Sequence, residues 1–251
     1  MQTTLETLFT PAEFEALGQR DLSHTVCVVF DVLRATTSML TALHNGAKLI
    51  LPVAEIGGAL ALRGRHPDAL LAGERHGVLI RAAQTGGVDF DLGNSPREFT
   101  PGRVAGKTII ITTTNGTRAL QACVGARQIL AGAFLNIAAL ARWINKEQPP
   151  HLLLVGAGTF KQAAYEDTLA AGALSDLVWG QFNQPADSAQ IARELYLAGR
   201  GDLSGAVERH SRNARRLLAN PDLREDVPFS IQRDTVPFAA FLKDGAVARM
   251  T

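Results

Sequence analysis

Apolar residues in this chain are concentrated in short, continuous runs. The strongest three are TVCVVF (25–30), KTIIIT (107–112) and HLLLVGAG (151–158). Continuous rather than alternating apolarity is typical of strands that are covered on both faces, as in a parallel sheet. Weaker runs predict three further strands: AKLILPV (47–53), DALLAGE (68–74) and RQILAGA (127–133). The pattern therefore predicts a buried sheet of mostly parallel strands.

Each strong run leads through small or hydroxyl residues into a segment with helical periodicity. These segments are TTSMLTALHNGA (36–47), NGTRALQACVGA (115–126) and QAAYEDTLAAGAL (162–174). The repeated order of strand, turn and helix predicts an α/β fold with three layers, α/β/α, around a mostly parallel sheet. Since glycine commonly follows the last turn of a helix, we expect these helices to end at Gly46, Gly125 and Gly172.

The first two units are similar to each other. VVFDVLRATTSMLTAL and IIITTTNGTRALQAC both place hydroxyl groups and an arginine, Arg34 or Arg118, where the strand gives way to the helix. One interpretation is an internal duplication that produces two similar, intertwined halves. The other is chance similarity between two strand–helix units.

The C-terminal part of the chain follows a different pattern. Residues 188–220 have helical periodicity and many charges but no strand-like run. We expect a helical part at about 185–225 within a single domain covering 1–251, because no Ser/Gly-rich linker divides the chain. The tail SIQRDTVPFAAFLKDGAVARM (230–250) predicts a short strand or a hairpin with KDG at its turn.

Composition narrows the classes of function. The chain has 251 residues, of which 46% are hydrophobic and 20% charged, so it can bury a substantial core. The net charge of +1 and the scattered Lys and Arg residues argue against a nucleic-acid partner.

The apolar runs are far shorter than the ~20 residues needed to span a bilayer. The N-terminus lacks a secretory pattern, and Cys27 and Cys123 lack metal spacing and are expected to be buried. We therefore expect a soluble cytoplasmic protein with no membrane partner.

Polar residues gather where the predicted strands end, which is where open α/β sheets bind their ligands. Asp31, Arg34, Thr36, Thr37 and Ser38 follow the first strand and reach the start of a predicted helix. Helix N-termini favour anions such as phosphate or sulfonate. N-capping by Thr36 or Ser38 would explain one hydroxyl but not the whole set, so an anion site is favoured.

The segment TTTNGT (112–117) has the equivalent place after the strand at 107–112. Asn-Gly alone is a common tight turn. Four threonines around it favour an anion cradle instead.

Other segments keep two interpretations open. Glu74 in AGER (72–75) is either a metal ligand or half of a surface ion pair, and DFDLGNSPREF (89–99) has the composition of a turn. GAGTFKQAAYEDT (156–168) lacks the last glycine of a dinucleotide-binding motif. Its acidic pair, Glu166 and Asp167, suits a hard cation such as Mg²⁺.

Two familiar phosphate chemistries are disfavoured. The chain contains no G-x-x-x-x-G-K-[ST] motif for a nucleotide-binding P-loop. Leu33 occupies the position two after Asp31 where an aspartyl-phosphate enzyme would carry a second aspartate.

Taken in order, six blocks give the chain a specific resemblance to a known family. They are FDVLRATTS, LLAGERHG, DLGNSPREF, TTTNGTRAL, GAFLNIAALA and GAGTFKQAAYEDTLAAGAL, between residue 30 and about 174. Together they resemble the 2-phosphosulfolactate phosphatase (ComB) family. The resemblance implies an α/β/α fold and Mg²⁺-dependent hydrolysis of 2-phosphosulfolactate to sulfolactate and phosphate, a step of coenzyme M biosynthesis.

The resemblance also implies roles for individual residues. Four carboxylates become candidate metal or water-handling groups: Asp31, Glu74, Glu166 and Asp167. The expected catalytic residues are Asp31, Arg34, Glu74 and Glu166, and the expected metal ligands are the four carboxylates. Candidates for binding the small polyanionic substrate are Thr36, Thr37, Asn94, Ser95, Thr113, Thr114, Asn115 and Gly116.

Our hypothesis is metal-assisted phosphoryl transfer to water, with two or three of the carboxylates converging on Mg²⁺. The alternative is a non-catalytic protein that binds a phosphorylated or sulfonated metabolite. A homodimer is the expected assembly.

Overall fold

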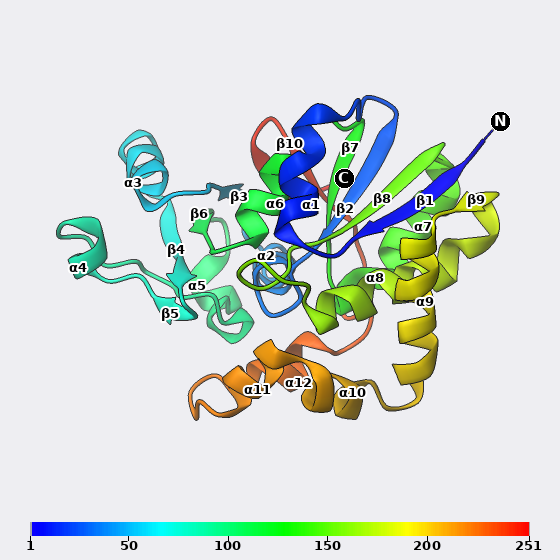
Figure 1. Cartoon of the computed structure of the whole chain (residues 1–251). Helices are drawn as coiled ribbons and strands as arrows, with labels where there is room; N and C mark the ends of the chain where they lie inside the picture. The colour runs from blue at the N-terminus through cyan, green and yellow to red at the C-terminus, as the bar shows by residue number, and fades with distance from the viewer. Residues whose placement is uncertain (1, 251) are drawn as a thin grey trace.

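A computed structural model describes residues 2–250, in which eleven strands form one sheet (Figure 1). The strands are β1 (Thr4–Leu8), β2 (Thr25–Phe30), β3 (Leu49–Pro52), β4 (Leu70–Arg75), β5 (Val78–Leu79), β6 (Thr108–Thr112), β7 (Gln128–Gly132), β8 (His151–Gly156), β9 (Gln184–Pro185), β10 (Ala240–Lys243) and β11 (Ala246–Arg249). Their order across the sheet is β5-β4-β6-β3-β11-β10-β7-β2-β8-β1-β9.

Helices connect and cover these strands. The α-helices are α1 (Pro11–Glu15), α2 (Ala35–His44), α3 (Ile56–Arg65), α4 (Ala82–Thr85), α5 (Pro101–Val104), α6 (Gly116–Ala122), α7 (Ile137–Glu147), α8 (Tyr165–Val178), α9 (Asp187–Gly199), α10 (Leu203–His210), α11 (Arg212–Leu218) and α12 (Asp226–Ser230). Short 3₁₀ helices are η1 (Ala16–Gln19), η2 (Pro96–Glu98), η3 (Phe134–Asn136), η4 (Trp179–Gln181) and η5 (Arg200–Asp202).

All six predicted apolar runs form strands, namely β2, β3, β4, β6, β7 and β8. The α/β class and the mostly parallel sheet are therefore confirmed. The pattern did not predict β1, whose sequence TLETL interleaves polar residues with leucines. β1 pairs in parallel with β8, and its Leu5 is fully buried.

The sheet consists of two parallel groups joined by a hairpin. β4, β6 and β3 are parallel to one another, as are β7, β2, β8, β1 and β9. The predicted C-terminal hairpin, β10 and β11, lies between the groups and pairs antiparallel with β7 on one side and β3 on the other. Because three successive pairings are antiparallel, the two groups run in opposite directions. The chain passes from one strand group to the other and back, so the two groups are intertwined. That the two groups are similar to each other stays a prediction.

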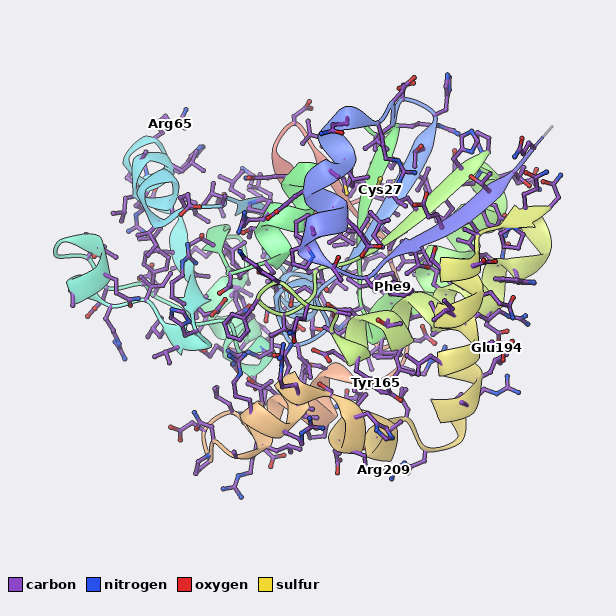
Figure 2. The ribbon with its side chains drawn as sticks, viewed as in Figure 1. Phe9, Cys27, Arg65, Tyr165, Glu194 and Arg209 are labelled. Atoms are coloured by element: carbon purple, nitrogen blue, oxygen red, sulfur yellow. The ribbon has the colours of Figure 1, made fainter. Side chains whose placement is uncertain are left out.

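Helices cover both faces of the group around β2, as the three-layer prediction requires. Cys27 and Val29 pack on one face with residues of α1, α2 and α6, whereas Val26 and Val28 pack on the other with α7, α8 and α9. Side chains fill the space on each face, and Figure 2 shows Cys27 within this packing. Both cysteines are free and buried, as predicted.

One of the three predicted helix ends is wrong. Gly46 and Gly125 follow α2 and α6 with positive φ values of 92° and 102°. Gly172 instead lies in the middle of α8. A Cβ atom at Gly172 would lie 2.0 Å from the carbonyl oxygen of Ala192, so this glycine allows α8 and α9 to approach closely.

The predicted C-terminal helical part is present as α9, α10, α11 and α12. The last three cross below α2 and α8 (Figure 1), and Tyr165 lies at that boundary (Figure 2). Within residues 2–250, every helix is too short or too polar to cross a membrane. That residues 1–251 form a single domain stays a prediction. Residues 1 and 251 lie outside the part of the chain that the structure describes.

Candidate active site

The turn after β2 fixes Asp31 at the start of α2. Asp31 Oδ1 accepts a hydrogen bond from the Ala35 amide at 3.0 Å. Thr36 closes the same turn, because its hydroxyl donates to the Asp31 carbonyl at 2.9 Å and accepts from the Asp31 amide at 3.0 Å. On the other side, a Cβ atom at Gly116 would lie 2.5 Å from Asp31 Oδ2. The carboxylate is therefore confined between two helix starts.

Arg34 is held by a carboxylate from the far end of the chain. Its Nη1 donates to Asp226 Oδ2 at 2.8 Å and its Nη2 donates to the Gly77 carbonyl at 3.0 Å. The side chains of Arg34 and Asp226 are only 4% and 0% exposed. Asp226 also accepts from Ser95 Oγ at 2.6 Å and Arg97 Nε at 2.9 Å. Ser95 thus supports Arg34 through a shared carboxylate.

Glu74, in β4, is fixed by main-chain and side-chain donors. Its Oε2 accepts from the Gly77 amide at 2.6 Å. Its Oε1 accepts from both the amide and the hydroxyl of Thr114, each at 2.8 Å. Three donors therefore hold this buried carboxylate in one orientation.

Asn94 and Asn115 bring two further loops to the same place. The amide nitrogen of Asn115 donates to the carbonyls of Ala157 at 3.1 Å and Gly158 at 3.0 Å, which ties the loop after β6 to the loop after β8. The carbonyl of Asn94 accepts from Ser38 Oγ at 2.8 Å. Its side-chain Oδ1 is buried and has no hydrogen-bond partner among residues 2–250.

One cavity collects these side chains at the junction of the two strand groups. The cavity is small and partly open to solvent. Six of the predicted residues line it: Asp31, Arg34, Glu74, Asn94, Thr114 and Asn115. They follow or end β2, β4 and β6, apart from Asn94 in the loop before η2. The cavity therefore combines strand ends from both groups.

Other predicted binding residues lie outside the cavity lining. The Thr37 hydroxyl donates to the Val32 carbonyl at 2.8 Å, and Thr113 Oγ1 accepts from the Thr117 amide at 3.3 Å. Like the Thr36 hydroxyl, these groups satisfy the backbone at the starts of α2 and α6. Gly116 contributes space beside Asp31 rather than a polar group.

Glu166 and Asp167 are engaged by the protein itself. Glu166 accepts from Ser211 Oγ and Asn213 Nδ2, both at 2.7 Å. Asp167 accepts from the amides of Val32 at 2.8 Å and Gly158 at 3.1 Å. Glu166 therefore fastens the C-terminal helices to α8, and Asp167 joins the loops after β2 and β8.

Burial and neighbouring negative charges raise the pKa values of Asp31 and Asp167. Burial, followed by the nearby charges of Glu74 and Glu166, raises the pKa of Asp31 to about 6, although the Ala35 amide and Arg34 oppose the shift. Burial, with Glu166 and Asp31, also raises the pKa of Asp167 well above its usual range. The site thus concentrates negative charge that a cation would relieve.

Comparison with known proteins identifies the family. A family model described as 2-phosphosulpholactate phosphatase matches residues 12–245. The chain belongs to that family. It is therefore related to phosphoric monoester hydrolases, as the resemblance implied.

Three relatives, each named a probable 2-phosphosulfolactate phosphatase, illustrate the match. A protein of Caldanaerobacter subterraneus subsp. tengcongensis is 36% identical over 243 residues, covering 96% of this chain and 97% of the relative. One of Deinococcus radiodurans is 39% identical over 213 residues, covering 84% of each. One of Thermotoga maritima is 36% identical over 213 residues, covering 84% of this chain and 87% of the relative.

The oxygen atoms that could bind Mg²⁺ in this member of the 2-phosphosulpholactate phosphatase family come from a few side chains. Among residues 2–250, no three or more Asp, Glu, His or Cys side chains are grouped to hold one metal ion. Asp31 and Glu74 line the cavity, whereas Glu166 and Asp167 do not. That two or three of these four carboxylates bind Mg²⁺ stays a prediction. Asp31, Glu74 and the unpartnered Asn94 Oδ1 still offer the cavity hard oxygen donors. That smaller set fits Mg²⁺, which commonly takes one or two carboxylates together with waters and substrate phosphate.

Sequence reasoning missed the contribution of the C-terminal helices. Asp226 is fully buried beneath Arg34, and Asn213 and Arg216 line the cavity. His76 and Gly77, within the quoted LLAGERHG block, line it as well. The only sequence signal for Asp226 is its position directly before the apolar Val227.

Proposed function

We propose that this protein hydrolyses 2-phosphosulfolactate to sulfolactate and phosphate in a Mg²⁺-dependent reaction. The observation that carries the proposal is the cavity in which two carboxylates, Asp31 and Glu74, face the same space as Arg34. Carboxylates hold the metal and a guanidinium holds the phosphate in many phosphoryl-transfer sites. The names of the relatives supply the substrate.

Asp31 and Glu74 would hold Mg²⁺, and the Asn94 amide oxygen is the third available donor. When bound, Mg²⁺ would supply positive charge that neutralises the phosphate and orients water. The Gly77 amide and Thr114 keep the Glu74 carboxylate in place through their hydrogen bonds. This network orients the carboxylate before substrate arrives.

Arg34 would bind the equatorial oxygens of the phosphate. Asp226 and the Gly77 carbonyl hold its guanidinium in one orientation. A fixed cation costs little reorganisation when negative charge develops on the phosphate, which is the basis of electrostatic catalysis. Asn115 would keep the loop after β8 closed over the cavity through its bonds to Ala157 and Gly158.

The test is phosphate release by the purified protein from small phosphorylated acids, with and without Mg²⁺. We expect 2-phosphosulfolactate to be the best substrate, and a chelator to abolish release until Mg²⁺ is restored. Tight binding of 2-phosphosulfolactate without any release would favour the non-catalytic binding protein instead.

Three associated predictions accompany this proposal. The reaction belongs to coenzyme M biosynthesis, the protein acts in the cytoplasm, and it forms a homodimer. Light scattering on the purified protein would test the dimer, and fractionation of the host cell would test the compartment.

A further inference from the structure

Two guanidinium groups lie close to Gly77. Arg34 Nη2 donates to the Gly77 carbonyl at 3.0 Å. A Cβ atom built on Gly77 would lie 3.6 Å from Arg216 Cζ. The Arg216 guanidinium therefore lies close to the backbone of Gly77, whose φ of 82° favours glycine. The two arginines thus meet at one residue although they come from α2 and α11.

The two cations differ in how their charges are balanced. Arg34 is buried and paired with Asp226. Arg216 is exposed, and its guanidinium makes no hydrogen bond or ion pair with any of residues 2–250. A guanidinium has several N–H donors and favours planar or tetrahedral oxyanions, so an unpaired one beside a binding cavity is available to a ligand.

Arg216 also belongs to the cavity itself. It lines the same space as Asp31, Arg34 and Glu74, and its neighbour on α11, Asn213, lines it too. The carboxylates repel an anionic ligand, while Arg34 already has a buried counter-charge. A ligand with more than one anionic group therefore gains most from the cation whose charge is unbalanced.

We propose that Arg216 binds the second oxyanion of the substrate, its sulfonate or its carboxylate, while Arg34 binds the phosphate. This inference rests on the proposed function, because it takes 2-phosphosulfolactate as the ligand. It makes Arg216 the residue that distinguishes a multiply charged acid from a simple phosphate ester.

The test compares Arg216→Gln with Arg224→Gln in the full chain. Arg224 is also exposed and precedes α12, but it does not line the cavity. Calorimetric titration would measure the affinities for sulfolactate, for lactate, which lacks the sulfonate, and for 2-hydroxyethanesulfonate, which lacks the carboxylate. Thermal denaturation would show that both variants stay folded.

We expect Arg216→Gln to weaken sulfolactate binding by about tenfold or more, the usual effect of losing a charge-assisted contact, and Arg224→Gln to change it less than about twofold. If the sulfonate is the contact, 2-hydroxyethanesulfonate binding falls and lactate binding does not. If the carboxylate is the contact, the pattern is reversed.

Unchanged sulfolactate affinity in Arg216→Gln, or no sulfolactate binding by the unaltered protein, would overturn the inference. Phosphate release by the unaltered protein tests the proposed function separately. Release combined with an unchanged affinity in Arg216→Gln would keep the phosphatase and remove Arg216 from it.

Discussion

Arg34 and Asp226 are 192 positions apart in the sequence, yet Arg34 Nη1 lies 2.8 Å from Asp226 Oδ2 in an almost solvent-free pair. The pair connects the start of α2, where the cavity begins, to α12. Removing one partner of such a pair leaves an uncompensated buried charge, which is far more costly than losing a surface ion pair.

Asp226→Ala should therefore destabilise the protein and impair phosphate release together. We expect the free energy of unfolding to fall by about 3–5 kcal/mol in urea denaturation. Arg97→Ala is the matched control, because Arg97 binds the same carboxylate but is 40% exposed. It should cost no more than about 1 kcal/mol. Equal losses of unfolding free energy in the two variants would contradict the view that the buried pair contributes more than the exposed one.

Gly116→Ala should disturb catalysis through a single methyl group. The added Cβ atom would lie 2.5 Å from Asp31 Oδ2, so the carboxylate must move. Misplacing a reacting or metal-holding group by about 1 Å can cost about 100-fold in rate, and we expect turnover to fall between about 10- and 100-fold. Gly102→Ala in α5 meets no atom within 4 Å and should keep full turnover.

Asp31→Asn should lower Mg²⁺-dependent turnover by about two orders of magnitude or more, because it removes a negative charge from the proposed metal and phosphate site. Circular dichroism should show an intact fold. A variant with near-normal turnover would exclude Asp31 from the chemistry.

The same substitution should change how stability depends on pH in metal-free protein. The folded protein holds the Asp31 proton up to about pH 6, whereas an ordinary aspartate has a pKa of 3.8. The folded state therefore binds more protons in this range, and the free energy of unfolding should decrease as pH rises from about 4 to about 6. Asp31→Asn should remove up to about 3 kcal/mol of this decrease and be the more stable protein at pH 8. Parallel stability curves for the two proteins would show that Asp31 titrates normally.

Substitution of Glu166 should lower the stability of the protein, whereas substitution of Glu74 should lower its affinity for Mg²⁺. Glu166→Ala leaves the buried Ser211 hydroxyl without its acceptor and removes one of the two acceptors of Asn213 Nδ2, so we expect a loss of about 2–4 kcal/mol of stability with Mg²⁺ affinity retained. Glu74→Gln should weaken Mg²⁺ binding by about tenfold or more. Calorimetric titration with Mg²⁺ separates the two outcomes. Loss of Mg²⁺ affinity in Glu166→Ala would return Glu166 to the metal set.

Local sequence features predicted the parts of the site that depend on strand ends. Asp31, Glu74 and Thr114 lie at or just beyond apolar runs, and a β-strand followed by polar residues is visible in a single sequence. The direction of a hydroxyl is not visible in this way. Thr36 and Thr37 look like ligand donors in sequence, but backbone carbonyls one turn earlier take their hydrogen bonds.

Contacts between distant segments account for most of what the sequence did not predict. Asp226 and Arg216 sit in a stretch of alternating charges, where a buried or cavity-facing residue looks the same as a solvated one. The place of β10 and β11 in the middle of the sheet likewise follows from pairing across more than 100 positions, between Leu242 and Ile129 and between Val247 and Ile50. Hydrophobic periodicity predicts a strand but does not select its partner.

That hairpin has a consequence for biosynthesis. Without β10 and β11, the group of β3 and the group of β7 share no strand pairing. Every other strand precedes residues 240–249 in the sequence. The pairing that joins the two groups beside the cavity can therefore form only after the strands of both groups have been synthesised.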